Sequence, residues 1–211
     1  MKNGRICIFI SLIVYSLILI GCEVKFSQSF VRNFFTDIKG PVFFYAVNTT
    51  LAVFLAWATA LMFAACIKCI DNTKVKRKEF YFYLSQVLLF FYIGVDDRFL
   101  FHESMGRLLQ VRDSYFVIIL GILEVALIIK LGNFKSLSRC VRRYLYCAAL
   151  FFSAMFIFDA FVSKEALLRL SIEDLSKTWG LLFVFLFAWS IFSEKITVFK
   201  NKLSSETKNR I

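Results

Sequence analysis

The sequence predicts an all-α polytopic membrane protein, a bundle of about six transmembrane helices in one membrane-embedded domain over residues 1–211. Hydrophobic residues make up 59% of the chain, above the 45–50% that is usual for soluble domains. The run over 42–67 carries no charge for 26 residues, and a helix needs only about 20 to cross a bilayer. Lys and Arg also concentrate in alternate connecting segments. Backbone N–H and C=O groups in lipid must hydrogen-bond one another, so membrane spans are helices or barrel strands. The apolar runs lack the alternation of apolar and polar residues that is typical of barrel strands, so helices are expected.

Six apolar runs are the predicted membrane spans, and short polar segments connect them. They cover residues 6–22, 42–67, 80–95, 115–131, 144–162 and 179–193. The segment 163–177 alternates apolar and charged residues at helical spacing, which predicts an amphipathic helix lying in the outer membrane interface.

The first span has two interpretations. Lys2 and Arg5 precede the apolar run, which ends in Leu-Ile-Gly-Cys, and this order resembles a bacterial lipoprotein signal with Cys22 as the lipidated residue. The run is about 17 residues long, whereas the apolar part of a signal is about 7–15. A retained first helix is therefore favoured over a cleaved segment 1–21, and both alternatives remain open.

The second span carries small residues at every fourth position. This ridge, with a polar residue at its start, is formed by Asn48, Ala52, Ala56, Ala60 and Ala64. Small side chains let helix backbones approach closely in lipid, and an asparagine can bond a neighbouring helix there. We expect this span to be the packing centre of the bundle.

The distribution of basic residues predicts the orientation. The terminal segments and the connections near 68–79 and 132–143 hold 17 of the 26 Lys and Arg residues. Basic segments stay on the cytoplasmic side during insertion, so both termini are predicted to be cytoplasmic. The net charge of +11 is explained in this way, and no nucleic-acid partner is expected. A single proline and a Phe-rich composition favour a bacterial inner (plasma) membrane, with the lipid bilayer itself as one partner.

A polar cluster follows the third span: Asp96, Asp97, His102 and Glu103. These side chains could bind a metal or carry out acid–base chemistry on the outer face. On a continuous helix, however, His102 points about 140° away from Asp97, so a site requires a break, with Gly94 as the candidate position. The alternative is simply a span end that reaches water.

The same stretch reads Asp-Asp-Arg-Phe-Leu-Phe-His-Glu over residues 96–103. It resembles a D-D-x-F-x-x-H-E pattern of uncharacterised bacterial multi-span membrane proteins. The resemblance covers eight residues and implies a bacterial membrane protein without implying an activity.

Two acids fall within predicted spans. Glu124 lies near the middle of 115–131 and Asp159 near the outer end of 144–162. A carboxyl group in lipid normally faces the bundle and has a partner, here Asn48, Gln86 or Lys130 for Glu124. Glu124 is either a proton- or cation-binding group in a transport path or a packing device, whereas Asp159 is expected to reach water.

Four cysteines lie near the predicted inner face: Cys66, Cys69, Cys140 and Cys147. Four thiols could form a tetrahedral metal site, but free cysteines also pack as small apolar residues. Packing is favoured, so no metal and no cofactor are expected. The chain has one histidine, no G-x-S-x-G and no phosphate-binding glycine loop.

These observations favour a non-enzymatic integral membrane protein that acts through contacts in the bilayer. An immunity, exclusion or phage-defence component fits this description, with a membrane protein or a second copy of the chain as the partner. A small cation- or proton-coupled transporter or channel using Glu124 is the alternative. An enzyme with an outer-face site at Asp96, Asp97, His102 and Glu103 is the second alternative.

Overall fold

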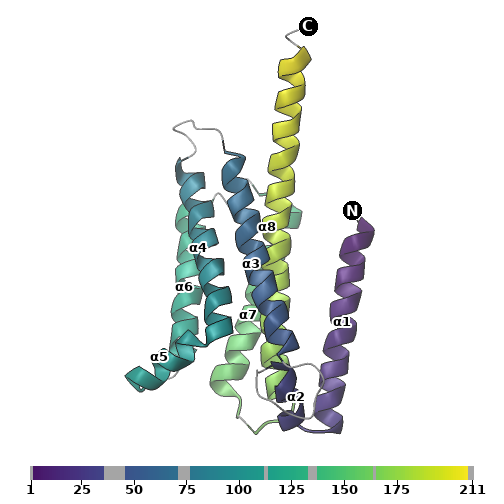
Figure 1. Ribbon diagram of the computed structural model, residues 1–211, viewed down its shortest axis with the longest axis vertical. Coiled ribbons are helices and arrows are strands. Elements are labelled where there is room, and N and C mark those ends of the chain that lie inside the picture. Colours follow the sequence, from purple (N-terminus) through teal and green to yellow (C-terminus); the bar gives the residue numbers. More distant parts are fainter. Residues whose placement is uncertain are drawn as a thin grey trace.

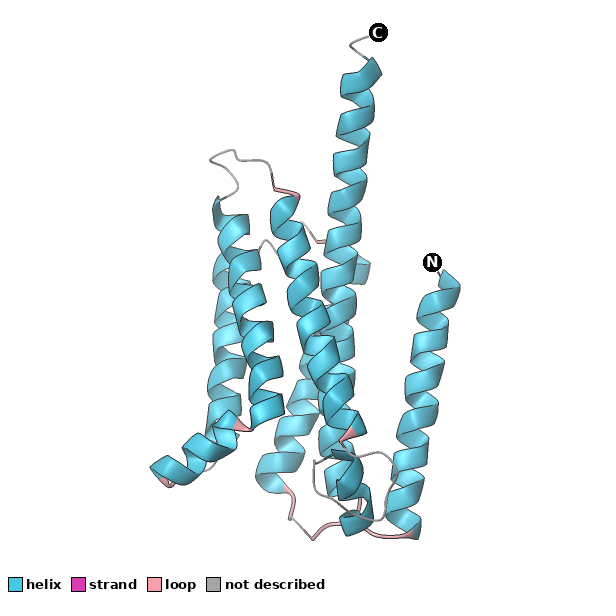
Figure 2. Ribbon diagram, in the orientation of Figure 1, coloured by secondary structure: helices cyan, strands magenta, loops and turns pink. Residues whose placement is uncertain are grey.

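The computed structural model describes six stretches of the chain, and these contain eight helices and no strand (Figures 1 and 2). The described residues are 2–35, 46–70, 77–111, 114–132, 137–163 and 165–208. The long helices are α1 (Lys2–Lys25), α3 (Val47–Lys68), α4 (Arg77–Phe99), α6 (Ser114–Leu131), α7 (Arg139–Phe161) and α8 (Arg169–Lys208). The short helices are α2 (Gln28–Phe35) and α5 (Phe101–Leu109).

The long helices run alternately up and down, so the first turn of α1 and the last turn of α8 point toward the same end of the bundle (Figure 1). The short helices α2 and α5 lie at the opposite end. The most extensive packing joins α7 to α8, α3 to α4 and α3 to α8. Helix α6 packs mainly on α4, and α1 packs on α2 and α8.

Among the described residues, four helical segments are long and apolar enough to cross a membrane. They are Ile6–Lys25, Val47–Lys68, Arg139–Phe161 and Arg169–Val198. The two remaining long helices, α4 and α6, coincide with the runs predicted at 80–95 and 115–131. Helix α8 has 40 residues and is therefore about 60 Å long, twice the thickness of a hydrocarbon core. Its last turns extend beyond the other helices (Figure 1).

The boundaries differ from the prediction at two places. Helix α3 begins at Val47, and residues 42–45 of the predicted second span lie outside the described residues. The prediction of a separate interfacial helix at 163–177 is wrong, because α8 begins at Arg169 and continues through this segment. Residue 164 lies outside the described part, and 169–177 form the first turns of α8. Ser171 and Leu175 are buried there, because the apolar side of this segment meets α1 and α2 rather than lipid.

The small-residue ridge of α3 lies inside the protein. Asn48, Ala52, Ala56 and Ala60 are buried, and Ala64 is half-buried. Ala52, Ala56 and Ala60 belong to the main core together with residues of α4, α7 and α8. Phe63 in the same helix is fully buried, and aromatic rings of α4 and α8 surround it. The ridge therefore packs α3 within its own chain.

Helix α1 contributes to the core through its inner side. Leu12 and Leu19 are buried, and Trp179 of α8 donates its indole N–H to Ser16 Oγ at 3.1 Å. The helix continues unbroken past Cys22, which is half-buried. These contacts pack residues 12–19 of α1 against α8.

Candidate functional site

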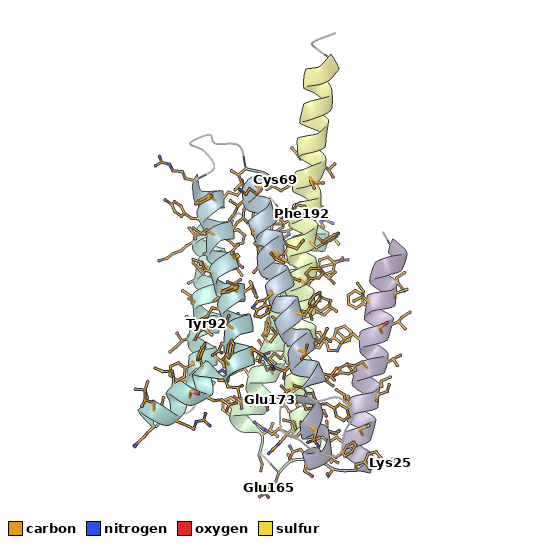
Figure 3. The ribbon with its side chains drawn as sticks, in the orientation of Figure 1. Lys25, Cys69, Tyr92, Glu165, Glu173 and Phe192 are labelled. Atoms are coloured by element: carbon orange, nitrogen blue, oxygen red, sulfur yellow. The ribbon has the colours of Figure 1, made fainter. Side chains whose placement is uncertain are left out.

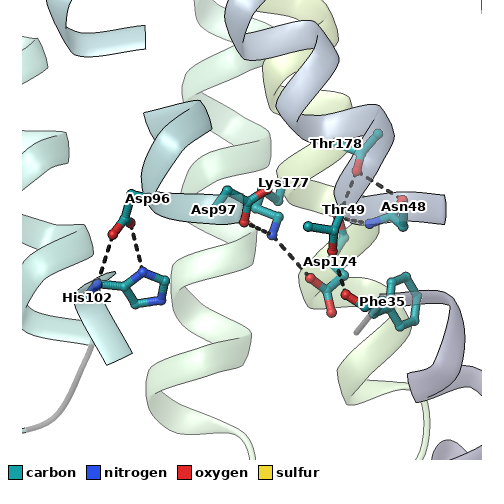
Figure 4. A network of polar contacts seen from close by, with 9 residues as sticks. All are labelled: Phe35, Asn48, Thr49, Asp96, Asp97, His102, Asp174, Lys177 and Thr178. Atoms are coloured by element: carbon teal, nitrogen blue, oxygen red, sulfur yellow. Dashed lines mark hydrogen bonds and ion pairs between the residues drawn. The ribbon is translucent and has the colours of Figure 1, made fainter. Parts of the chain in front are cut away.

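The break between α4 and α5 lies at Leu100, where the backbone is left-handed with a φ of 54°. The Asp96 carboxylate stabilises this turn, because it accepts the backbone N–H of His102 at 2.8 Å and contacts His102 Nδ1 at 2.7 Å. Figure 4 shows both contacts. The helix therefore breaks at Leu100 rather than at Gly94, and the break brings Asp96 and His102 together.

Asp97 points away from this pair and toward α8. Lys177 Nζ donates to Asp97 Oδ1 at 2.6 Å and lies 3.5 Å from Asp174 Oδ1 (Figure 4). Glu103 lies in the first turn of α5 and lines a shallow depression with Arg107. The four polar residues predicted as one outer cluster are thus divided between different contacts. In the described stretches, no three His, Cys, Asp or Glu side chains are grouped to hold a metal.

A second set of polar contacts joins α3 to α8. Asn48 Nδ2 donates to the Asp174 carbonyl at 3.2 Å, and Thr178 Oγ1 donates to Asn48 Oδ1 at 3.0 Å (Figure 4). Asn48 and Thr178 are both fully buried. Asn48 is predicted to form a hydrogen bond with a neighbouring helix. In the structure that helix is α8.

Glu23 connects the end of α1 to the start of α8. Its carboxylate accepts the backbone N–H groups of Leu168 and Ser171, each at 3.1 Å, and also the Ser171 hydroxyl. Only 1% of Glu23 is exposed. The first N–H groups of a helix have no partner within the helix, so an acid from another helix caps α8 here. Sequence reasoning missed Glu23, because nothing in its neighbourhood marks it as buried.

Asp159 forms an ion pair with Arg169. The Arg169 guanidinium lies 3.0 Å from Asp159 Oδ1 and 3.0 Å from Glu173 Oε2. Arg169 is buried and joins the end of α7 to the first turns of α8. Figure 3 shows Glu173 at this end of the molecule. Asp159 therefore takes part in an ion-pair network at the same end as Lys177 and Glu23.

Glu124 pairs with Gln86, one of its predicted candidates. Gln86 Nε2 donates to Glu124 Oε2 at 2.9 Å, and this bond joins the middle of α4 to the middle of α6. Gln86 is 1% exposed, and its Oε1 has no partner among the described residues. A neutral carboxylic acid facing a primary amide can form two parallel hydrogen bonds. A protonated Glu124 would therefore supply the donor that Gln86 Oε1 lacks.

The four cysteines of the predicted inner face are not grouped to hold a metal in the described stretches. Cys66 is buried in α3, Cys69 and Cys147 are half-buried, and Cys140 is exposed on α7. They fall within the described stretches, where no metal-binding group of side chains is found. Cys69 is labelled in Figure 3 near the end of α3.

An aromatic surface on α3 and α4 was not predicted as a site. Trp57 lies in the middle of α3, is 39% exposed and stacks on Phe91 of α4 with ring centroids 6.4 Å apart. It covers Gly94, where an added Cβ would lie 2.3 Å from Trp57 Nε1. Phe54 and Leu61 are exposed on the same side of α3. The mid-span position of Trp57 was the available signal, because Trp usually sits at membrane boundaries.

The sequence model of one family matches residues 6–191, which include all the contacts described above. The family is described as "Domain of unknown function (DUF8692)". No curated protein and no solved structure matches the chain.

Proposed function

The chain belongs to the DUF8692 family, and we propose that it is a non-enzymatic integral membrane protein that acts by binding another protein within the bilayer. We place it in a bacterial inner membrane with six spans and both termini in the cytoplasm. The alternating direction of the long helices supports six spans. The excess of Lys and Arg at the end that holds the termini supports the orientation.

The arrangement of polar side chains supports a binding role over an enzymatic one. Asp96 and His102 stabilise a helix break, and Asp97 pairs with Lys177. Glu23 caps α8. Each of these groups is engaged in holding helices together. An active site needs several such groups directed at a shared pocket, and the depression beside Glu103 does not include the other three.

The surface that we propose for the partner is the aromatic surface of α3 and α4, formed by Phe54, Trp57, Leu61 and Phe91. Aromatic side chains are enriched at protein interfaces. Trp57 Nε1 lies over Gly94 of α4, while Trp57 as a whole is 39% exposed beside Phe54 and Leu61. Adjoining large apolar side chains that stay exposed are typical of interaction surfaces. This exposed aromatic surface in the middle of α3 is the observation that carries the proposal.

The small-residue ridge is not available to the partner, because Ala52, Ala56 and Ala60 are buried within the chain. The partner is therefore expected to be a membrane protein, or a second copy of this chain, that meets α3 and α4 from the lipid side. An immunity, exclusion or phage-defence component would act in this way, by binding or blocking a protein in the membrane.

Site-specific photo-crosslinking in cells tests this proposal. A photoreactive residue at Phe54 should give a discrete adduct, whereas the same residue at Leu17, an equally exposed position on α1, should give none. A second copy would add 24.5 kDa, and another protein would add its own mass. Trp57→Ala should remove the adduct, and Trp57→Phe should weaken it. Equal crosslinking at Phe54 and Leu17, or an adduct unaffected by Trp57→Ala, would contradict the proposal.

A proton-coupled transporter is the second candidate, and the Glu124–Gln86 pair is the observation that favours it. Protonated Glu124 would form two hydrogen bonds with Gln86. Release of the proton would leave only the bond that Gln86 Nε2 donates. This candidate predicts a pH-dependent flux through purified protein in proteoliposomes, and the flux should be lost in Glu124→Gln. Proteoliposomes without such a flux would exclude it.

A further inference from the structure

Helix α5 has two distinct sides. Phe101, Met105, Leu108 and Leu109 are all exposed, and they fall within about 100° of one another around the helix. Glu103 and Arg107 lie on the other side, at about 200° and 240° from Phe101. Such a helix in water would leave four large apolar side chains unburied.

The position of α5 is fixed by the turn that precedes it. The Asp96 carboxylate binds the backbone and the ring of His102, and Leu100 takes the left-handed conformation between them. As a result α5 points sideways, away from the bundle, at the end where α4 finishes and α6 begins (Figure 1). Its nine residues span only about 13 Å, which is too short to cross a bilayer.

We propose that α5 lies in the outer leaflet of the membrane, at the boundary between phospholipid headgroups and acyl chains. Its four apolar side chains contact the upper part of the acyl chains, and the Arg107 guanidinium contacts lipid phosphate. This interaction goes beyond the proposed partner binding and does not depend on it, whereas the assignment to the outer leaflet rests on the proposed orientation of the chain.

Two observations select lipid as the occupant. The apolar side of α5 continues onto Phe99 and Leu100, which are exposed at the foot of α4, and α4 packs on the candidate span α3. The surface is therefore continuous with the surface that faces hydrocarbon. Arg107 is exposed, and its guanidinium donates a 3.4 Å hydrogen bond to Ser104 Oγ, while no ion pair joins it to a described acid. An arginine beside an apolar helix side is suited to phosphate at that depth.

Lipid-based fluorescence quenching tests the proposal on the full chain in nanodiscs. In a variant whose six native cysteines are replaced, Leu108→Cys carries an environment-sensitive fluorophore, and Glu103→Cys is the matched control. Lipids with a nitroxide at carbon 5 should quench the label at Leu108 at least about twofold more than lipids with a nitroxide at carbon 12. Aqueous iodide should quench the label at Glu103 and leave the label at Leu108 largely unaffected.

Two results would overturn the proposal. Equal iodide quenching at both positions would place α5 in water, and shielding of Leu108 from lipid and iodide alike would place it against protein. Met105→Cys, on the same side of α5, repeats the measurement if Leu108→Cys does not fold. The outcome is separate from the crosslinking at Phe54, which concerns a different surface of the bundle.

Discussion

Replacement of Glu23 by alanine should destabilise the junction between α1 and α8. The change removes the acceptor of two backbone N–H groups, those of Leu168 and Ser171, in a place where Glu23 is 1% exposed. A buried donor left without a partner costs about 1–3 kcal/mol, and an acid at a helix N-terminus contributes roughly 0.3–1 kcal/mol more. Water can reach part of Leu168, so we expect a total loss of about 3 kcal/mol.

The free energy of unfolding can be measured by titration of the detergent-solubilised protein with a denaturing detergent. In a background with Trp57→Phe and Trp189→Phe, the fluorescence of Trp179 reports on the packing of α1 on α8, because its indole donates to Ser16 of α1. Glu165→Ala is the matched control, since Glu165 is exposed next to the same junction (Figure 3). Glu23→Gln keeps one acceptor oxygen and should lose about half as much. If Glu23→Ala unfolds at the same point as Glu165→Ala, Glu23 does not cap α8 and the reasoning is refuted.

Two further substitutions test the contacts of α4. Gly94→Ala would place a Cβ 2.3 Å from Trp57 Nε1 and should cost about 1–3 kcal/mol in the same titration, while Gly121→Ala, which meets no atom within 4 Å, should be neutral. Equal effects of the two substitutions would show that Trp57 does not pack on Gly94. Glu124→Leu should cost about 1–2 kcal/mol because the buried Gln86 Nε2 donor loses its acceptor, whereas Glu124→Gln should stay within about 0.5 kcal/mol of the native chain. If the Glu124→Leu and Glu124→Gln variants are equally stable, the hydrogen bond between Glu124 and Gln86 does not stabilise the packing of α4 on α6.

The helical class and the approximate positions of the long helices could be predicted, because both depend on local properties. An apolar run of sufficient length marks a helix that lipid can accommodate, whichever helices lie beside it. The predicted runs at 6–22, 42–67, 144–162 and 179–193 each overlap one of the four segments that are long and apolar enough to cross a membrane. Their exact ends were less predictable, since helices continue into the polar segments, as α8 does.

The partners of the polar residues could not be predicted, because they depend on how distant segments meet. Asp97 and Lys177 are 80 positions apart, and Glu23 and Ser171 are 148 apart. The amphipathic pattern of 163–177 could not locate this segment for a related reason, because an apolar helix side has the same sequence pattern whether protein or lipid covers it. The break at Leu100 had no turn residue to mark it, because the Asp96 carboxylate stabilises it from the preceding helix.

Our central proposal is that this chain spans a bacterial inner membrane with both ends in the cytoplasm. Paired reporters that are active on only one side of the membrane test it most directly, when fused before residue 2, after residue 208 and within 165–167. We expect cytoplasmic reporters at both ends and an external reporter at 165–167. Reporters at the two ends on opposite sides, or a chain that alkaline carbonate releases from membranes, would contradict it.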